Sequence, residues 1–114
     1  MMLTDDAKNA MLQGLADKLN EGANASLVIY ADDDAVATFE MPNPIDDSIT
    51  SGKLTFNLPK QVLATASATP TTAKLFNGNS IEVALLTIGT DMILDNSAVY
   101  KGGYVSITSL TIQI

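Results

Sequence analysis

The sequence contains no histidine, no cysteine and no tryptophan among its 114 residues. Without histidine a nucleophilic triad has no imidazole base, and without cysteine the chain forms no disulfide. These absences remove most of the side chains that carry out catalysis. The sequence therefore predicts a protein that is not an enzyme, that uses no cofactor and that works by presenting a surface.

Basic residues are also scarce: thirteen acidic side chains against six basic ones give a formal charge of −7. The six lysines are scattered along the chain, at Lys8, Lys18, Lys53, Lys60, Lys74 and Lys101. This charge opposes a nucleic-acid backbone and an anionic membrane surface. A protein partner is favoured, although the same charge also serves solubility alone.

Long hydrophobic runs are absent. No stretch approaches the ~20 apolar residues that span a bilayer. The segment Met1–Asp6 lacks the basic and apolar regions of a secretory signal. We expect a soluble protein that is made in a cytoplasm.

Apolar residues nevertheless make up 46% of the chain, which excludes general disorder. A chain of this length forms one domain, so we predict a single domain over residues 1–114. Aromatic residues contribute only 5%, so the core depends on Leu, Ile, Val, Met and Ala.

Residues 4–21 are predicted to form the one amphipathic helix. Thr4 is a suitable N-cap, and Asp5 and Asp6 lie where the helix dipole favours negative charge. The predicted apolar face consists of Ala7, Met11, Leu12, Leu15 and Leu19. Gly14 is expected to allow close packing against another element.

Residues 26–114 are predicted to form a β-rich body. Ser26–Ala31 and Ala35–Met41 form a hairpin across three aspartates, with Ala35, Ala37, Phe39 and Met41 on one face. Further strands are predicted at Lys53–Leu58, Gln61–Thr69, Thr72–Phe76, Ser80–Ile88, Met92–Leu94 and the C-terminal segment. Pro42 to Ser48 is predicted to be a loop. About seven to eight short antiparallel strands indicate a β-sandwich, which we assign to the jelly-roll type, or a partly open barrel.

The C-terminal segment changes its side-chain phase. Val105 and Ile107 share one phase, whereas Leu110, Ile112 and Ile114 share the other. A strand cannot change phase without an inserted residue, so we predict a bulge near Thr108 and Ser109. We also expect this strand to be exposed, and its five apolar residues are the candidate interaction residues.

Three groups of aspartates are the only candidates for chemistry. They are Asp32 to Asp34, Asp46 with Asp47, and Asp91 with Asp95. Such oxygens can bind calcium, but the spacing of an EF-hand is absent, and aspartates are ordinary turn residues. Glycoside hydrolysis by paired carboxylates is disfavoured by the scarcity of aromatic rings. We predict neither a metal site nor a catalytic site.

Several short motifs resemble a known family. Lys8–Ala16 contains Asn-Ala-Met-Leu, Leu27–Tyr30 follows, Gly89–Met92 forms a turn, and Val105–Ile112 reads Val-Ser-Ile-Thr-Ser-Leu-Thr-Ile. In the order of these motifs the chain resembles a family of small virion proteins of tailed bacteriophages. The size and β character are similar to those of head decoration proteins, also called cement or staple proteins.

The resemblance implies a capsid decoration protein that binds the outer head shell and stabilises contacts between capsid subunits. It implies the major capsid protein as partner, a homo-oligomer (dimer or trimer), and a location on the virion surface. It implies no catalytic residues.

Two alternatives stay open. One is a structural component of the phage tail, collar or fibre. The other is a non-catalytic module that binds carbohydrate or calcium through the acidic loops.

Overall fold

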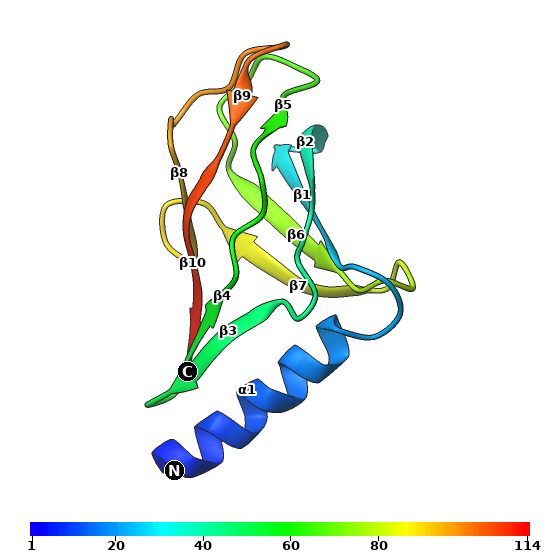
Figure 1. Ribbon diagram of the computed structural model, residues 1–114. Helices are drawn as coiled ribbons and strands as arrows, with labels where there is room; N and C mark the ends of the chain where they lie inside the picture. Colours follow the sequence, from blue (N-terminus) through cyan, green and yellow to red (C-terminus); the bar gives the residue numbers. More distant parts are fainter.

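Ten β-strands and one α-helix make up the computed structural model, which describes residues 1–114 (Figure 1). The elements are α1 (Asp5–Leu19), β1 (Ser26–Ala31), β2 (Asp34–Glu40), β3 (Asp46–Thr50), β4 (Lys53–Phe56), β5 (Val62–Leu63), β6 (Thr72–Phe76), β7 (Glu82–Thr87), β8 (Met92–Leu94), β9 (Tyr104–Val105) and β10 (Ile107–Gln113). The predicted mainly β fold with one N-terminal helix is confirmed. The strand count exceeds the prediction because β3 forms where a loop was predicted, and because β9 and β10 divide the predicted C-terminal strand.

The strands form two four-stranded antiparallel sheets and one small pair. The first sheet has the order β2-β1-β6-β7, the second sheet has the order β3-β4-β10-β8, and β5 pairs with β9. Both large sheets contribute to a single apolar core, which includes Leu27 and Leu75 from the first and Leu54 and Leu110 from the second. The body is therefore β-sandwich-like. Its assignment to the jelly-roll type stays a prediction.

Helix α1 begins and ends where the sequence predicts, but its buried side differs. The Thr4 hydroxyl accepts a hydrogen bond from the Ala7 N–H at 3.2 Å, which caps the first turn. The buried residues are Leu12, Ala16 and Leu19, a stripe that packs toward β3 and β4. Met11, predicted to face inward, is exposed.

The expectation for Gly14 was also wrong, because no other element lies within 4 Å of the place that a Cβ would occupy. The helix has fifteen residues and is neither long nor apolar enough to cross a bilayer.

A single side chain joins the end of α1 to β3. The Asn20 amide donates to an Asp46 carboxylate oxygen at 3.0 Å, and its carbonyl oxygen accepts from the Ile45 N–H at 2.8 Å. The prediction of a loop from Pro42 to Ser48 was wrong in its second half, where β3 begins. Pro42 and Pro44 precede β3, and β3 is an edge strand. Neither proline therefore removes a hydrogen bond from the sheet.

The first hairpin forms as predicted but contains a bulge. The register pairs Ile29 with Ala37 and Tyr30 with Ala35, so Val36 is the extra residue. An extra residue lets two successive side chains face inward, and Val36 and Ala37 are both buried. Ala35 is consequently exposed, so the predicted common face holds for Ala37, Phe39 and Met41 but not for Ala35.

The segment predicted as a strand over Gln61–Thr69 is mostly irregular. Only Val62 and Leu63 form a strand, and the chain then changes partners. The Thr65 N–H donates to the Val36 carbonyl of β2, whereas the Ala64 N–H donates to the Gly103 carbonyl. Because the segment lies between two partners, it does not form one regular ladder. Leu58, predicted to face inward, is exposed beyond the end of β4.

The bulge predicted near Thr108 and Ser109 is confirmed. Leu94 pairs with Ile107 and Ile93 pairs with Ser109, so Thr108 is the inserted residue. The insertion brings Ile107 and Leu110 onto the same buried side despite their odd spacing.

Candidate interaction surfaces

The five C-terminal candidate residues divide into buried and accessible ones. Val105, Ile107 and Leu110 are buried in the core, Ile112 is half-buried, and Ile114 is 42% exposed. β10 lies between β4 and β8, which pair with different parts of it. The expectation of an exposed C-terminal strand is therefore wrong for most of its length. The three buried residues stabilise the fold, and only Ile112 and Ile114 remain candidates for contact with a partner.

A more accessible apolar surface lies on the first sheet. Its outer face, the side directed away from the core, carries Val28, Tyr30, Lys74, Phe76 and Leu85; these five residues are called the outer face below. Val28 pairs with Lys74 and Lys74 with Leu85, so these three side chains form one row across three strands. Directly opposed side chains share a face of a sheet, so the row is held by the backbone ladder.

The lysine in this row is fixed by two contacts. The Lys74 ammonium lies 5.3 Å from the centroid of the Tyr30 ring and 3.4 Å from a Glu82 carboxylate oxygen. Both charged side chains are partly exposed, so the pair contributes about 1 kcal/mol or less to folding. The main consequence of the two contacts is that the Lys74 ammonium is held in a fixed position beside the apolar side chains of the outer face.

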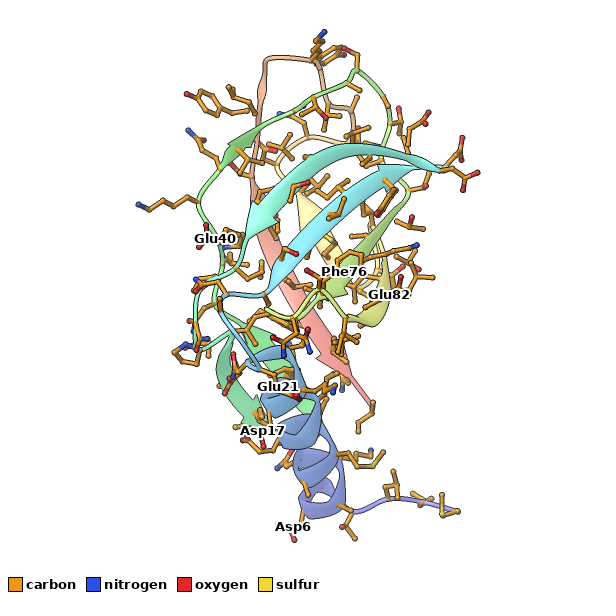
Figure 2. All side chains as sticks on the ribbon, turned by 90° about the vertical axis from the view of Figure 1, so that its right-hand side faces the viewer. Asp6, Asp17, Glu21, Glu40, Phe76 and Glu82 are labelled. Carbon is orange, nitrogen blue, oxygen red and sulfur yellow. The ribbon has the colours of Figure 1, made fainter.

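Acidic side chains border the outer face. The register places Glu40, Ser26, Phe76 and Glu82 in one row across the first sheet. Figure 2 shows Phe76 between Glu40 and Glu82, with further carboxylates along α1 below them. This arrangement of an apolar centre and a charged border is typical of protein-binding surfaces.

A second accessible surface lies at the apex, the end of the body formed by β5 and β9 (Figure 1). Leu63 pairs with Tyr104 there, and both side chains are exposed, as is Tyr100. The two tyrosines line a shallow cavity of about 310 Å³ together with Asn96 and Ser97. Aromatic rings beside amide and hydroxyl groups can contact both apolar and polar parts of a ligand.

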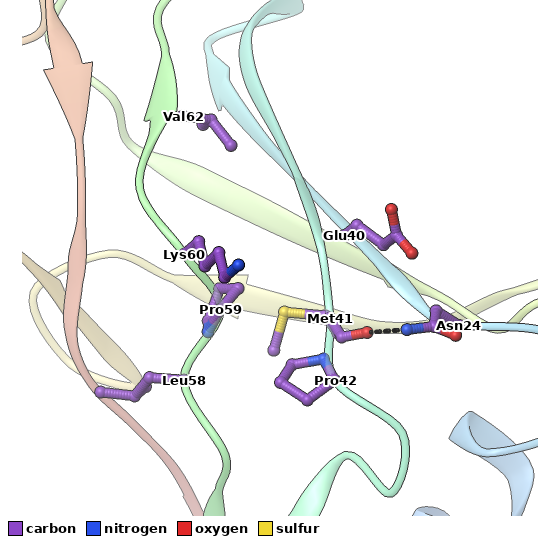
Figure 3. A pocket seen from close by; sticks show the side chains of 8 residues that line it. All are labelled: Asn24, Glu40, Met41, Pro42, Leu58, Pro59, Lys60 and Val62. Atoms are coloured by element: carbon purple, nitrogen blue, oxygen red, sulfur yellow. Dashed lines mark hydrogen bonds between the residues drawn. The ribbon is translucent and has the colours of Figure 1, made fainter.

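The largest hollow is an open groove of about 540 Å³ between the end of β2 and the segment that leads into β5 (Figure 3). It is lined by Asn24, Glu40, Met41, Pro42, Leu58, Pro59, Lys60 and Val62. The Asn24 amide donates to the Met41 carbonyl at 2.9 Å, which fixes the wall on the β2 side. Glu40 and Lys60 give the two walls opposite charges.

The aspartates serve the local structure. Asp91 accepts from the Thr87 N–H at 2.9 Å, and Asp95 accepts from the Asn96 and Ser106 N–H groups. Asp46 binds the Asn20 amide, and Asp32 lies in the first hairpin turn with a positive φ of 56°. No three acidic side chains converge into a group that could hold a metal ion.

The sequence interpretation did not select the outer face. A signal for it existed in Ser26–Ala31, where apolar residues occupy both phases of the strand. Leu27 and Ile29 are buried, whereas Val28 and Tyr30 point outward. A strand that is apolar on both faces predicts a second contact surface.

No protein-family model, no curated protein and no solved structure matches the chain.

Proposed function

We propose that this protein is a structural protein of a tailed-bacteriophage virion, a decoration protein that binds the outer head shell and stabilises contacts between major capsid protein subunits. Two things support the proposal: the resemblance of its sequence motifs to small phage virion proteins, and the outer face of the first sheet. The proposed location is the capsid surface, and the proposed partner is the major capsid protein.

The outer face is the observation that carries the proposal. Tyr30, Phe76 and Leu85 are presented by three paired strands, so they need little further ordering on binding. Preordered aromatic side chains give affinity with a low entropy cost. The acidic border favours a capsid surface with basic residues around an apolar depression.

The shape of the body also suits a bridging role. Its longest dimension is 43 Å, and β5 with β9 lies at the opposite end from both termini (Figure 1). Two accessible apolar surfaces, the outer face and the apex, are thus available to different neighbours. Two linked weak contacts gain about 10²–10⁴ in avidity over one.

The proposed attachment can be tested with purified heads that lack the protein. Tyr30→Ser removes a ring from the outer face, and Tyr104→Ser makes the same change at the apex. We expect Tyr30→Ser to weaken binding to the heads about tenfold or more, which corresponds to about 1.4 kcal/mol per factor of ten. Equal binding by wild type and Tyr30→Ser would exclude the outer face as the contact, and a loss confined to Tyr104→Ser would move the contact to the apex.

The cement role needs a measurement on the particle. Heads that carry the protein should retain their DNA at higher temperature than heads without it. The copy number should be comparable with that of the major capsid protein. Equal heat stability would contradict cementing, and a copy number of only a few per virion would favour the tail, collar or fibre alternative.

The apex cavity favours a second candidate, a non-catalytic carbohydrate-binding module. Tyr100 and Tyr104 can stack on the apolar face of a sugar, while Asn96 and Ser97 can bind its hydroxyl groups. Titration with host cell-wall oligosaccharides, followed by chemical shifts of the tyrosine rings, tests this candidate. Saturable shifts that Tyr104→Ser abolishes would support it, and unchanged shifts at millimolar sugar would remove it.

A further inference from the structure

The turn between β6 and β7 contains the one Asn-Gly pair of the chain, Asn77 and Gly78. In an unfolded chain, asparagine followed by glycine is the sequence most prone to deamidation. The reason is steric, because glycine has no side chain to shield its backbone nitrogen, which is the attacking atom. The proposed function does not use this reactivity, so the pair is a candidate modification site.

Deamidation begins when the Gly78 nitrogen attacks the Asn77 Cγ atom. The new N–Cγ bond closes a succinimide ring, the Cγ–Nδ2 bond breaks, and Nδ2 leaves as ammonia with the proton that the Gly78 nitrogen loses. Water then adds to one of the two ring carbonyls and opens the ring to aspartate or isoaspartate. Solvent water is the only co-reactant, so the reaction needs no enzyme.

The Asn77 side chain is held away from this reaction. Asn77 is 2% exposed, and its side-chain oxygen accepts from the Asn79 and Ile81 N–H groups at 3.0 and 3.1 Å. Its Nδ2 atom, the leaving group, donates to the Lys18 carbonyl at 3.4 Å. Rotation of the side chain toward the Gly78 nitrogen breaks these bonds, and buried polar groups without partners are costly.

The attacking nitrogen is held as well. The Gly78 N–H donates to the Glu21 carbonyl at 2.9 Å. A Cβ on Gly78 would collide with the main chain of Ala23, so only glycine fits this contact. The turn thus requires glycine for close packing and asparagine for its side-chain hydrogen bonds, and the two requirements together create the reactive pair.

We propose that Asn77 is a deamidation site which the fold keeps closed, and which opens when the β6–β7 turn separates from the end of α1 and the segment after it. Both holding groups, the Lys18 and Glu21 carbonyls, lie there. One separation therefore frees the leaving group and the attacking nitrogen together. The reaction proceeds only from the open fraction of molecules, so its rate reports the free energy of this local opening.

Deamidation makes the opening permanent. Isoaspartate passes the main chain through the former side chain, which inserts a carbon atom just before Gly78, where no space is left beside Ala23. Aspartate places an oxygen opposite the Lys18 carbonyl, where the Asn77 amide donated a hydrogen bond. Neither product restores the docked turn. This inference concerns the isolated chain and does not depend on the proposed function.

Peptide mapping by mass spectrometry measures the reaction in the isolated protein, incubated at mildly alkaline pH with and without urea. We expect Asn77 to react in the folded protein at least about a hundredfold more slowly than in urea, which corresponds to an opening free energy of about 2.8 kcal/mol or more. Asn96, whose side chain is exposed and which precedes Ser97, is the internal control and should be slowed less. Similar rates of Asn77 deamidation with and without urea, or a slowing no greater than that of Asn96, would overturn the proposal.

Hydrogen exchange identifies the event that opens the site. The Gly78 amide exchanges only when its bond to the Glu21 carbonyl is broken. Folding should therefore slow deamidation at least as much as it slows exchange of this amide. Deamidation that is slowed by less would show that Asn77 reacts in the docked turn, which the proposal excludes.

Asn77→Asp imitates one product and tests its consequence. We expect a lower urea midpoint than in wild type and faster exchange of the Gly78 amide. Asn96→Asp adds the same charge at an exposed position and should change neither quantity. An Asn77→Asp protein with the wild-type midpoint and wild-type exchange at Gly78 would refute the permanent opening.

Discussion

Gly78 lies so close to Ala23 that a Cβ on Gly78 would stand 2.2 Å from the Ala23 nitrogen. The Gly78 N–H also donates to the Glu21 carbonyl at 2.9 Å. The turn between β6 and β7 is thus packed directly against the segment between α1 and β1. This contact ties the helix end to the sheet that carries the outer face.

The first prediction concerns this contact. Gly78→Ala forces two backbone segments apart, since the atoms that a new methyl group meets belong to main chain and cannot rotate away. We expect the free energy of unfolding to fall by about 3 kcal/mol, at the upper end of the usual cost of overpacking. Urea denaturation measures the loss as a lower midpoint with an unchanged slope.

The second prediction supplies the matched control. Gly14 lies within α1, and a Cβ there meets nothing within 4 Å. Gly14→Ala should therefore raise the free energy of unfolding by about 1 kcal/mol, through helix propensity alone. If Gly78→Ala raises the urea midpoint as Gly14→Ala is expected to do, the close approach of Gly78 to Ala23 is wrong.

The third prediction concerns Asn77, the one buried polar side chain. Its carbonyl oxygen accepts from the Asn79 and Ile81 N–H groups at 3.0 and 3.1 Å, and its amide donates to the Lys18 carbonyl at 3.4 Å. Asn77→Ala leaves these groups without their partner, so we expect a loss of about 2 kcal/mol.

Asn96→Ala is the control for this loss, because the Asn96 side chain is exposed. Its effect should stay within about 0.5 kcal/mol. Hydrogen exchange gives a separate reading: the Ile81 amide should lose protection in Asn77→Ala. An Ile81 amide that exchanges at the same rate in wild type and in Asn77→Ala would exclude its hydrogen bond to the Asn77 side chain.

Local chemistry explains the parts of the fold that were predictable. Thr4 caps α1 because its hydroxyl can accept from the first turn, and this depends on three neighbouring residues only. The inserted Thr108 was visible because a phase change between Ile107 and Leu110 has few structural solutions. In both cases the determinants lie within a few residues of each other.

The parts that were missed depend on partners distant in sequence. β3 is anchored by Asn20, which is 26 residues from Asp46, and nothing around Asp46 indicates this. The irregular course after Leu63 follows from competition between β2 and β9 for the same segment. The outer face required the strand order, since Tyr30 and Leu85 become members of one surface only when β6 lies between β1 and β7.

The last prediction separates the structural part of the C-terminal strand from its accessible end. Leu110→Ala removes a buried side chain between the sheets and should lower the free energy of unfolding by about 2–5 kcal/mol. Ile114→Ala changes an exposed side chain and should have an effect within about 0.5 kcal/mol. Thermal unfolding of both variants measures the difference.

The same pair also distinguishes core from interface in function. If the protein binds heads as proposed, Leu110→Ala should bind them as wild type does at a temperature where it is still folded, because its side chain is buried. A folded Leu110→Ala that fails to bind would show that this part of β10 contacts the partner, and it would contradict the burial of Leu110. Ile114→Ala has no core role, so any loss of binding that it shows reports on direct contact at the end of the chain.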